Sequence, residues 1–338
     1  MTSPVENEHG HRETEGPRDA GESRTAPLHR RAVRWFGWFV VAVVFGYFFI
    51  AQLSHLGSSR SLTGVRLEEA EYEEVFFENT DAGIGLGGML FRPEGEGPFP
   101  AAVVIHGSGE SRRRYIWYLT LASYLREHGI AVLLPDKRGS ESSEGDWRTA
   151  SFEDLARDAL AGVAFIRGVE WIEEGRVGLI GLSQGGHIAP LAASLSSDVD
   201  FVVNVVGAAL PMHDVLVYEE VHNLRQMGIV PGLSDLMAPV TAWTLIHLRD
   251  RELWSSVGNF DPRPYWRRLA VEGLVLYGED DTNVPSARSA EELEALGNPR
   301  IRVKIYEGSG HALEDPPERG NSIFREDALA EIREFIVV

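Results

Sequence analysis

The order of apolar and amphipathic segments along the 338-residue chain predicts a protein of alternating strands and helices. Short runs rich in Val, Ile and Leu, without polar alternation, are typical of strands buried on both faces, as in a parallel sheet. Such runs indicate strands at residues 75–78, 84–91, 101–105, 130–135, 177–182, 201–206, 274–277 and 301–305. Apolar residues at helical spacing predict helices at 115–128, 152–167, 185–194, 287–296 and 324–336. Helices in these positions are expected to cover both faces of the sheet.

Two features depart from this alternation. The first two strands are separated by the turn residues Asn79, Asp81 and Gly83, which predicts an antiparallel pair. Between about residues 210 and 266 there is no strand-like run, and apolar residues recur at helical spacing instead. We therefore expect a helical cap inserted at about 210–266 into a single domain that spans residues 71–338.

A hydrophobic segment of another kind lies near the N-terminus. The run from Trp35 to Leu53 is almost wholly apolar and is about long enough to cross the roughly 30 Å hydrocarbon core of a bilayer as a helix. Arginines precede it and glutamates follow it, so the positive-inside rule puts the N-terminus in the cytoplasm. A cleaved signal peptide and a buried core helix are the alternatives. We expect a single-pass membrane protein with an uncleaved signal-anchor and an extracytoplasmic domain, preceded by a disordered cytoplasmic tail at 1–34 and followed by a linker at 54–70.

Composition excludes several classes of function. The chain has no cysteine, which rules out disulfides, thiolate metal sites and cysteine nucleophiles. Its formal net charge of -19 argues against nucleic-acid binding, because phosphate contacts need clustered lysine and arginine. The histidines show no metal-ligand spacing, so neither a metal nor another cofactor is expected. No protein partner is indicated.

The first candidate for chemistry is the serine of a G-x-S-x-G pattern, Ser183, between a predicted strand and a predicted helix. A serine there lies on a sharp turn that raises its hydroxyl above the sheet edge, and Gly181 and Gly185 let the backbone fold tightly around it. The pattern alone often arises by chance, so its position after a strand carries the prediction. A binding protein of the same fold without turnover is the non-enzymatic alternative.

A serine hydroxyl needs an adjacent base that is itself oriented by an acid. Both occur downstream in the chain. Asp280 and Asp281 follow the strand at 274–277, and His311 follows the last strand in a glycine-rich loop. Loops in these positions bring a carboxylate and an imidazole to the same sheet edge as the serine. Either aspartate fits this reasoning.

At this point the sequence resembles the α/β-hydrolases, over about four-fifths of its length. The resemblance implies an α/β-hydrolase fold with a mostly parallel central sheet of about eight strands. The G-x-x-D-x-x-V-P stretch at 278–285 resembles the acid loop of that family and selects Asp281 over Asp280. The G-x-G-H stretch that ends at His311 resembles the histidine loop.

A His-Gly-Ser-Gly stretch after the third strand resembles the oxyanion loop of the same family. In the family, a backbone N–H of this loop and the N–H of the residue after the nucleophile hold the developing oxyanion. The resemblance assigns these two donors to Ser108 and Gln184. His106, Gly107 and Gly109 are expected to orient and support the loop.

The resemblance is strongest to bacterial serine esterases, thioester hydrolases and dienelactone hydrolases with a D-K-R-G stretch. In that stretch Asp136 and Arg138 are expected to brace the loop, and Glu141 stands where glycine is usual. We therefore expect a serine hydrolase that cleaves a small carboxylic ester or thioester through an acyl-enzyme on Ser183. An acyltransferase or a peptidase for small substrates would use the same residues.

Overall fold

The computed structural model describes Trp35, Trp38, and residues 60–249 and 251–338. The chain divides by its internal contacts into two units, Met1–Ser54 and His55–Val338, and the second contains every strand and helix named here. The predicted tail, and the predicted membrane span apart from its two tryptophans, lie outside the described residues. Among the helices of the described part, none is both long and apolar enough to cross a membrane.

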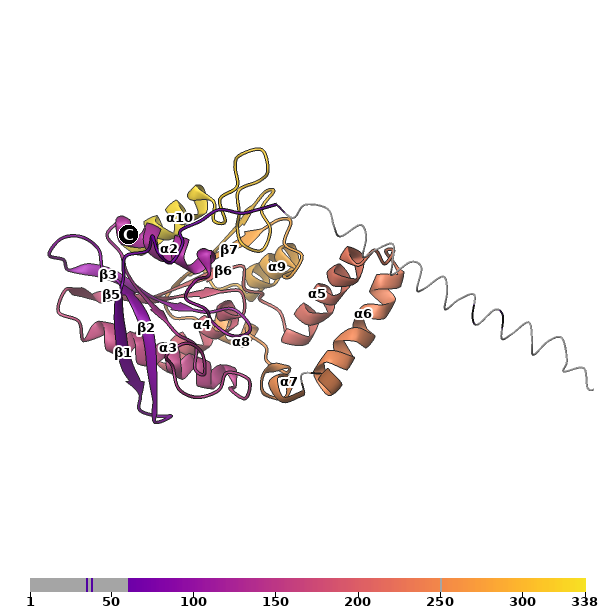
Figure 1. The fold of residues 1–338 in the computed structure, drawn as a ribbon, viewed down its shortest axis with the longest axis horizontal. Coiled ribbons are helices and arrows are strands. Elements are labelled where there is room, and N and C mark those ends of the chain that lie inside the picture. The colour runs from indigo at the N-terminus through magenta and orange to yellow at the C-terminus, as the bar shows by residue number, and fades with distance from the viewer. Residues whose placement is uncertain (1–34, 36–37, 39–59, 250) are drawn as a thin grey trace, which may run out of the picture. The chain divides into compact units, whose positions relative to one another are not determined.

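An eight-stranded, mostly parallel sheet forms the centre of the unit His55–Val338 (Figure 1). The order across the sheet is β1-β2-β4-β3-β5-β6-β7-β8. β1 pairs with β2 and β2 with β4 in antiparallel fashion, and all other neighbours are parallel. The strands are β1 Glu73–Asn79, β2 Ile84–Phe91, β3 Phe99–Ile105, β4 Ala131–Pro135, β5 Ile172–Leu182, β6 Phe201–Val205, β7 Glu272–Gly278 and β8 Ile301–Tyr306. β5 begins earlier than predicted because its first residues are largely exposed and gave no apolar run.

Helices cover both faces of this sheet, as predicted. They are α2 Ile116–Glu127, α3 Phe152–Arg167, α4 Gly185–Leu195, α8 Arg263–Arg268, α9 Ser286–Leu296 and α10 Glu326–Val337. Residues of α3, α4, α8 and α9 share one buried apolar cluster, and those of α2 and α10 share the other. The side chains of β3 alternate between the two, since Val103 belongs to the first cluster and Ala102 and Val104 to the second. This two-sided burial explains the unbroken apolar runs in the sequence.

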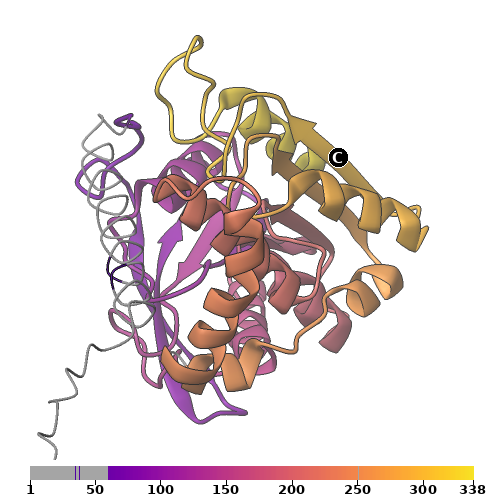
Figure 2. The same cartoon turned by 90° about the vertical axis from the view of Figure 1, so that its right-hand side faces the viewer.

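Between β6 and β7 the chain forms the inserted helices seen face-on in Figure 2. They are α5 Met212–Gln226, α6 Leu233–Thr244, a π-helical turn Leu245–Arg249, and α7 Arg251–Val257. α8 falls within the predicted cap interval, but its Trp266 is fully buried in the core beside α4 and α9. The inserted cap therefore comprises α5 to α7. The Tyr218 hydroxyl of α5 donates a 2.8 Å hydrogen bond to the Asp281 carbonyl, which ties the cap to the loop after β7.

Residues 60–70, the described part of the predicted linker, lie against the domain. Thr63 forms a parallel bridge with Ser322. The Val65 amide donates a 2.9 Å hydrogen bond to Thr120 Oγ1, and the Val65 side chain packs on the cluster that contains α2 and α10. The few apolar residues of this stretch are thus partly buried, so this part belongs to the domain and is not a free linker.

Candidate active site

Ser183 lies on the turn between β5 and α4. Its φ is +53°, in the left-handed region that residues other than glycine rarely adopt. The Ser183 amide donates a 2.9 Å hydrogen bond to the Val205 carbonyl, which holds the turn against β6. A Cβ at Gly181 would lie 2.2 Å from the Gly185 carbonyl oxygen, and one at Gly185 would lie 2.2 Å from the Ile105 carbonyl oxygen. This close approach of backbones is the local reason for a glycine on each side of the serine.

Three of the side chains singled out in the sequence form one hydrogen-bonded chain. Ser183 Oγ lies 2.9 Å from His311 Nε2, and His311 Nδ1 lies 2.8 Å from Asp281 Oδ2. An ionised carboxylate only accepts, so the hydrogen of the imidazole belongs on Nδ1. The lone pair of Nε2 then faces the serine hydroxyl. In this arrangement the histidine can accept the hydroxyl proton.

The loop after β7 presents only one of its two aspartates to the histidine. The Asp281 side chain is fully buried, and its Oδ1 accepts hydrogen bonds from the amides of Asn283 and Val284 at 2.8 and 2.9 Å. Asp280 is exposed, and its amide donates to the Ser309 carbonyl. Burial and two backbone donors fix the position of Asp281, whereas the side chain of Asp280 points to solvent.

Ser108 and Gln184 line the same cavity as Ser183. Within the part of the chain that the structure describes, the backbone N–H of neither residue has a hydrogen-bond acceptor. Both donors therefore stay available to a ligand beside the serine hydroxyl. The Gly107 amide, by contrast, donates a 2.9 Å hydrogen bond to the buried hydroxyl of Tyr118. This bond attaches the loop to α2.

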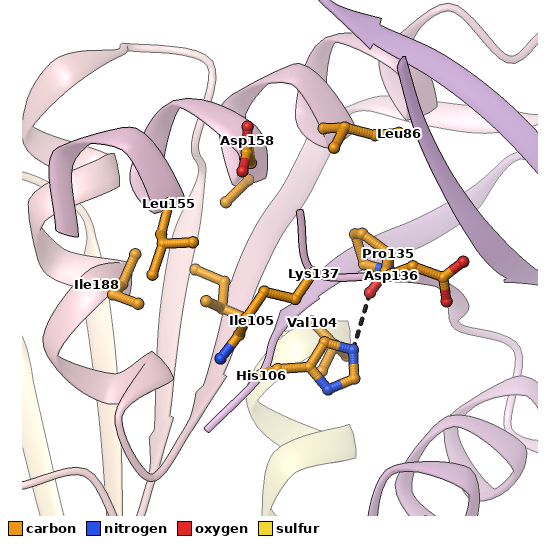
Figure 3. Close-up of a pocket in the computed structure, with 11 residues that line it drawn as sticks. Leu86, Val104, Ile105, His106, Pro135, Asp136, Lys137, Leu155, Asp158 and Ile188 are labelled. Carbon is orange, nitrogen blue, oxygen red and sulfur yellow. Dashed lines mark hydrogen bonds between the residues drawn. The ribbon is translucent and has the colours of Figure 1, made fainter. Parts of the chain in front are cut away.

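A buried lysine holds the same loop from behind. Lys137 Nζ donates to the carbonyl oxygen of Gly107 and, at 2.9 Å, to that of Gly109. Burial lowers the pKa of Lys137 to about 7. A cavity of about 40 Å³ beside it is also lined by His106, whose Nε2–H donates a 2.8 Å hydrogen bond to the Pro135 carbonyl (Figure 3). Burial lowers the pKa of His106 to about 4, so at neutral pH it is an uncharged support of the loop.

The D-K-R-G stretch contributes the other supports of this region. Asp136 accepts hydrogen bonds from Arg113 at 3.0 and 2.8 Å, and Arg138 donates to Asp158 at 2.6 and 2.8 Å. Glu141 has a φ of +48°, the conformation that glycine favours at this place in the pattern. The turn thus keeps its glycine-like backbone although the residue is glutamate.

A cavity of about 330 Å³ opens above Ser183 and is roofed by the cap. α7 contributes Leu253, Trp254 and Val257, and α5 contributes Met212, Val215 and Glu219. Trp117 of α2 closes another side; its Nε1–H donates to the Ala312 carbonyl at 2.9 Å, and its ring lies 5.9 Å from that of His311. Within the described residues, no three His, Asp or Glu side chains gather as metal ligands.

Two residues of this region were not singled out in the sequence. In the sequence, Lys137 had no role beyond its place in the D-K-R-G stretch. Its position just after a buried strand could have indicated that it is buried. Glu219 follows the apolar residues Val215 and Leu216 by four and three positions in the same helix. This spacing indicates that it lies on the inward face. Neither signal identifies a role without the fold.

The model of the alpha/beta hydrolase family matches residues 102–321, well over half of the chain. The chain belongs to this family. The α/β-hydrolase is 25% identical over 257 residues to the esterase EstD of Thermotoga maritima, covering 70% of this chain and 60% of that protein. It is 34% identical over 289 residues to the thiohydrolase aneE of Aspergillus aculeatus, covering 72% of this chain and 87% of that protein. It is 25% identical over 243 residues to the peroxisomal succinyl-coenzyme A thioesterase of Mus musculus, covering 67% of this chain and 52% of that protein. The chain thus spans only 60% of the bacterial esterase and 52% of the mouse thioesterase.

Solved structures of other α/β-hydrolases have the same fold. GrgF of Penicillium superposes with a TM-score of 0.59 at 18% identity, covering 79% of this chain and 98% of GrgF. The Pyrococcus furiosus esterase Pf2001 superposes with a TM-score of 0.57 at 18% identity, covering 83% and 98%. At this identity the likeness concerns the fold alone.

Proposed function

We propose that this α/β-hydrolase cleaves carboxylic esters or thioesters through an acyl-enzyme on Ser183. One observation carries the proposal: Ser183, His311 and Asp281 form a continuous hydrogen-bonded chain, with 2.9 and 2.8 Å links, beside a cavity lined by apolar and polar side chains. The esterase and thioesterase names of its relatives support the same class of reaction.

In the proposed first step, Ser183 Oγ attacks the carbonyl carbon of the substrate while His311 Nε2 takes the hydroxyl proton. Asp281 keeps the imidazole in the correct tautomer and stabilises its positive charge. The oxyanion accepts hydrogen bonds from the N–H groups of Ser108 and Gln184, and one such donor typically contributes about 2.7–4 kcal/mol to transition-state stabilisation. The C–O or C–S bond then breaks, and His311 gives its proton to the leaving alcohol or thiol.

Water completes the cycle on the acyl-enzyme. His311 removes a proton from the water, whose oxygen adds to the acyl carbon. The second tetrahedral intermediate then expels Ser183 Oγ, which recovers its proton from His311. An acyltransferase would replace the water by an acceptor alcohol, and a peptidase would release an amine in the first step. These alternatives differ in the acceptor or the leaving group and not in the nucleophile.

Fluorophosphonate labelling of the full-length protein in detergent tests the nucleophile. We expect labelling of the wild type, none of Ser183→Ala, and strongly reduced labelling of His311→Ala. Ser194→Ala, near the end of α4, is the matched control and should label as the wild type does. Persistent labelling of Ser183→Ala would refute the assignment.

Turnover of p-nitrophenyl butyrate and butyryl-coenzyme A, with and without an added alcohol, tests the reaction. Hydrolysis without the alcohol is the expected result. Product that forms only when the alcohol is present would show that the protein is an acyltransferase and not a hydrolase.

A further inference from the structure

Glu219 is a carboxyl group on the face of α5 that lines the cavity above Ser183. Met212, Val215 and Glu219 all line this cavity and are spaced by three and four residues, so they lie on one face of the helix. The first two are apolar, and the third stands where a further apolar residue would continue the stripe. A carboxyl at such a position departs from the pattern that packs the rest of the helix, and such departures concentrate at functional sites.

The described part of the chain places no fixed counter-ion against this carboxyl. Among the described residues, Glu219 has neither a hydrogen bond nor an ion pair, whereas its neighbour Glu220 accepts a hydrogen bond from Asn223. Burial, and secondarily the charges of Glu220 and Asp281, raise the pKa of Glu219. His311 opposes this shift, but it also has to serve Asp281. A carboxylate taken out of water without a partner is unfavourable, so its ionised form gains from a cation that enters the cavity.

The rest of the cavity fits a cationic ligand. The side chains of Trp117 and Trp254 line it, and among the residues that the structure describes no lysine or arginine does. Aromatic faces together with a carboxylate are the usual surroundings of ammonium groups in proteins. The cap helix is also held in place, since the residue before Glu219 donates its hydroxyl to the loop after β7. This bond ties the helix that carries Glu219 to the loop that holds Asp281.

We propose that this cavity selects ester or thioester substrates that carry a positively charged ammonium group, which binds Glu219 between the two tryptophans. The inference rests on the proposed hydrolase function and names its substrate class. It assigns Glu219 to substrate recognition, because nothing in the acyl transfer requires a second carboxylate.

Matched cationic and neutral esters test this proposal on the full-length protein. For a charge in the alcohol portion, the pair is butyrylcholine and 3,3-dimethylbutyl butyrate, which differ only by nitrogen in place of carbon. For a charge in the acyl portion, the pair is the p-nitrophenyl esters of 4-(trimethylammonio)butanoic acid and 5,5-dimethylhexanoic acid. The measurement is the ratio of kcat/KM, cationic over neutral, within each pair. Glu219→Gln removes the charge at nearly constant shape, and Glu220→Gln removes a charge from the same helix outside the cavity lining.

In the wild type we expect at least one pair to favour the cationic ester. We expect Glu219→Gln to lower that ratio about tenfold, because the quaternary ammonium loses its Coulomb attraction to the carboxylate at the cavity wall, and Glu220→Gln to leave it unchanged. No cationic preference in either pair, or a preference that survives Glu219→Gln, would overturn the proposal while leaving the hydrolase intact. Equal losses for both esters of a pair would also overturn it, because they would show that Glu219 acts on His311 instead. Absence of turnover with every ester and with butyryl-coenzyme A would refute the hydrolase function and this inference together.

Discussion

Replacing Lys137 by methionine should slow turnover without weakening substrate binding. The Gly107 carbonyl that accepts from Lys137 Nζ belongs to the same peptide unit as the N–H of Ser108. In a trans peptide these two groups point in opposite directions. An ammonium group on the carbonyl side therefore both orients and polarises the N–H on the side of the cavity. The second bond, 2.9 Å to Gly109, fixes the next part of the loop.

The expected fall in kcat is limited because Lys137→Met keeps the Ser108 N–H and removes only its support. Complete loss of one oxyanion donor costs about 2.7–4 kcal/mol, which is an upper limit because the Ser108 N–H remains. A hydrogen bond from a charged group contributes about 1.5–3 kcal/mol, and only part of it is transmitted to the oxyanion. We therefore expect kcat to fall about 10- to 100-fold, or about 1.4–2.7 kcal/mol. KM should change less than about twofold, because the oxyanion exists only at the transition state.

Steady-state kinetics with p-nitrophenyl butyrate, together with the affinity for a trifluoromethyl ketone, provide the assay. The ketone forms a tetrahedral adduct, so its affinity should fall in proportion to kcat/KM. Lys137→Arg should recover part of the loss, because a guanidinium can still donate to both carbonyls. A kcat within twofold of the wild type, in Lys137→Met that melts normally, would refute the reasoning. A loss confined to KM would refute it as well.

The same lysine should leave a signature in the pH dependence of kcat. Burial lowers the pKa of Lys137 to about 7, and its neutral amine is a weaker donor than its ammonium form. The support of the oxyanion loop should therefore decline as the pH rises through about 7. His106, with a pKa of about 4, stays neutral over this range, and Asp136 and Asp158 at the same cavity are each paired with an arginine. Lys137→Arg stays charged throughout and should lack this decline; a decline that persists in it would assign the effect to another group.

Four further perturbations test the site, the turn, the core and the N-terminal segment. Asp281→Asn should lower kcat by about 10⁴-fold, because an amide favours the wrong histidine tautomer, whereas Asp280→Asn should leave it nearly unchanged; equal losses would reassign the acid. Gly185→Ala places a Cβ 2.2 Å from a backbone oxygen and should destabilise the fold by about 1–3 kcal/mol, so an unchanged melting temperature would contradict the turn geometry. Burial lowers the pKa of His187 to about 4. Below about pH 6.5 this histidine is therefore protonated in the unfolded chain while it stays neutral in the folded chain. Stability should then fall by about 1.6 kcal/mol from this group between pH 6.5 and 5. His187→Leu should remove that share of the pH dependence of stability, as measured by urea unfolding at each pH; an unchanged pH dependence would count against it. The full-length protein should resist extraction from membranes by alkaline carbonate, and a variant without residues 35–53 should be released; release of both would argue against the proposed anchor.

The strands and helices were largely predictable because two-sided burial leaves a simple mark in the sequence. The run 201–206 is apolar at every position except the buried Asn204, so its length and spacing predicted β6 closely. The start of β5 was missed because an exposed strand end has no such mark. α8 was assigned to the cap because helical spacing shows which residues face inward but not what they face. Trp266 belongs to the core through contacts with α4 and α9 that only the fold brings together.

The hydrogen-bonded chain at Ser183 follows from topology as much as from motifs. β5, β7 and β8 lie in the same parallel part of the sheet, so the loops that follow them meet at one edge. Sequence order therefore brought Ser183, the aspartates and His311 together without knowledge of any distance. The choice between Asp280 and Asp281 needed the resemblance to a family, because adjacent residues differ in burial and not in chemistry.

The buried Lys137 and the partly buried Glu219 were missed for a common reason, and the structure separates their roles. Pattern reading treats Lys and Glu as exposed, so it gives no weight to either residue inside the domain. Lys137 donates hydrogen bonds to two backbone carbonyls, so its ammonium group positions the loop that contains Ser108. Glu219 lines the cavity above Ser183 without a partner among the described residues, so its charge remains available to a ligand that enters. A buried charge with partners in the protein indicates positioning, whereas a partly buried charge without such a partner at a cavity wall indicates recognition. On this basis Lys137 should control the rate for every ester, and Glu219 should control which ester is preferred.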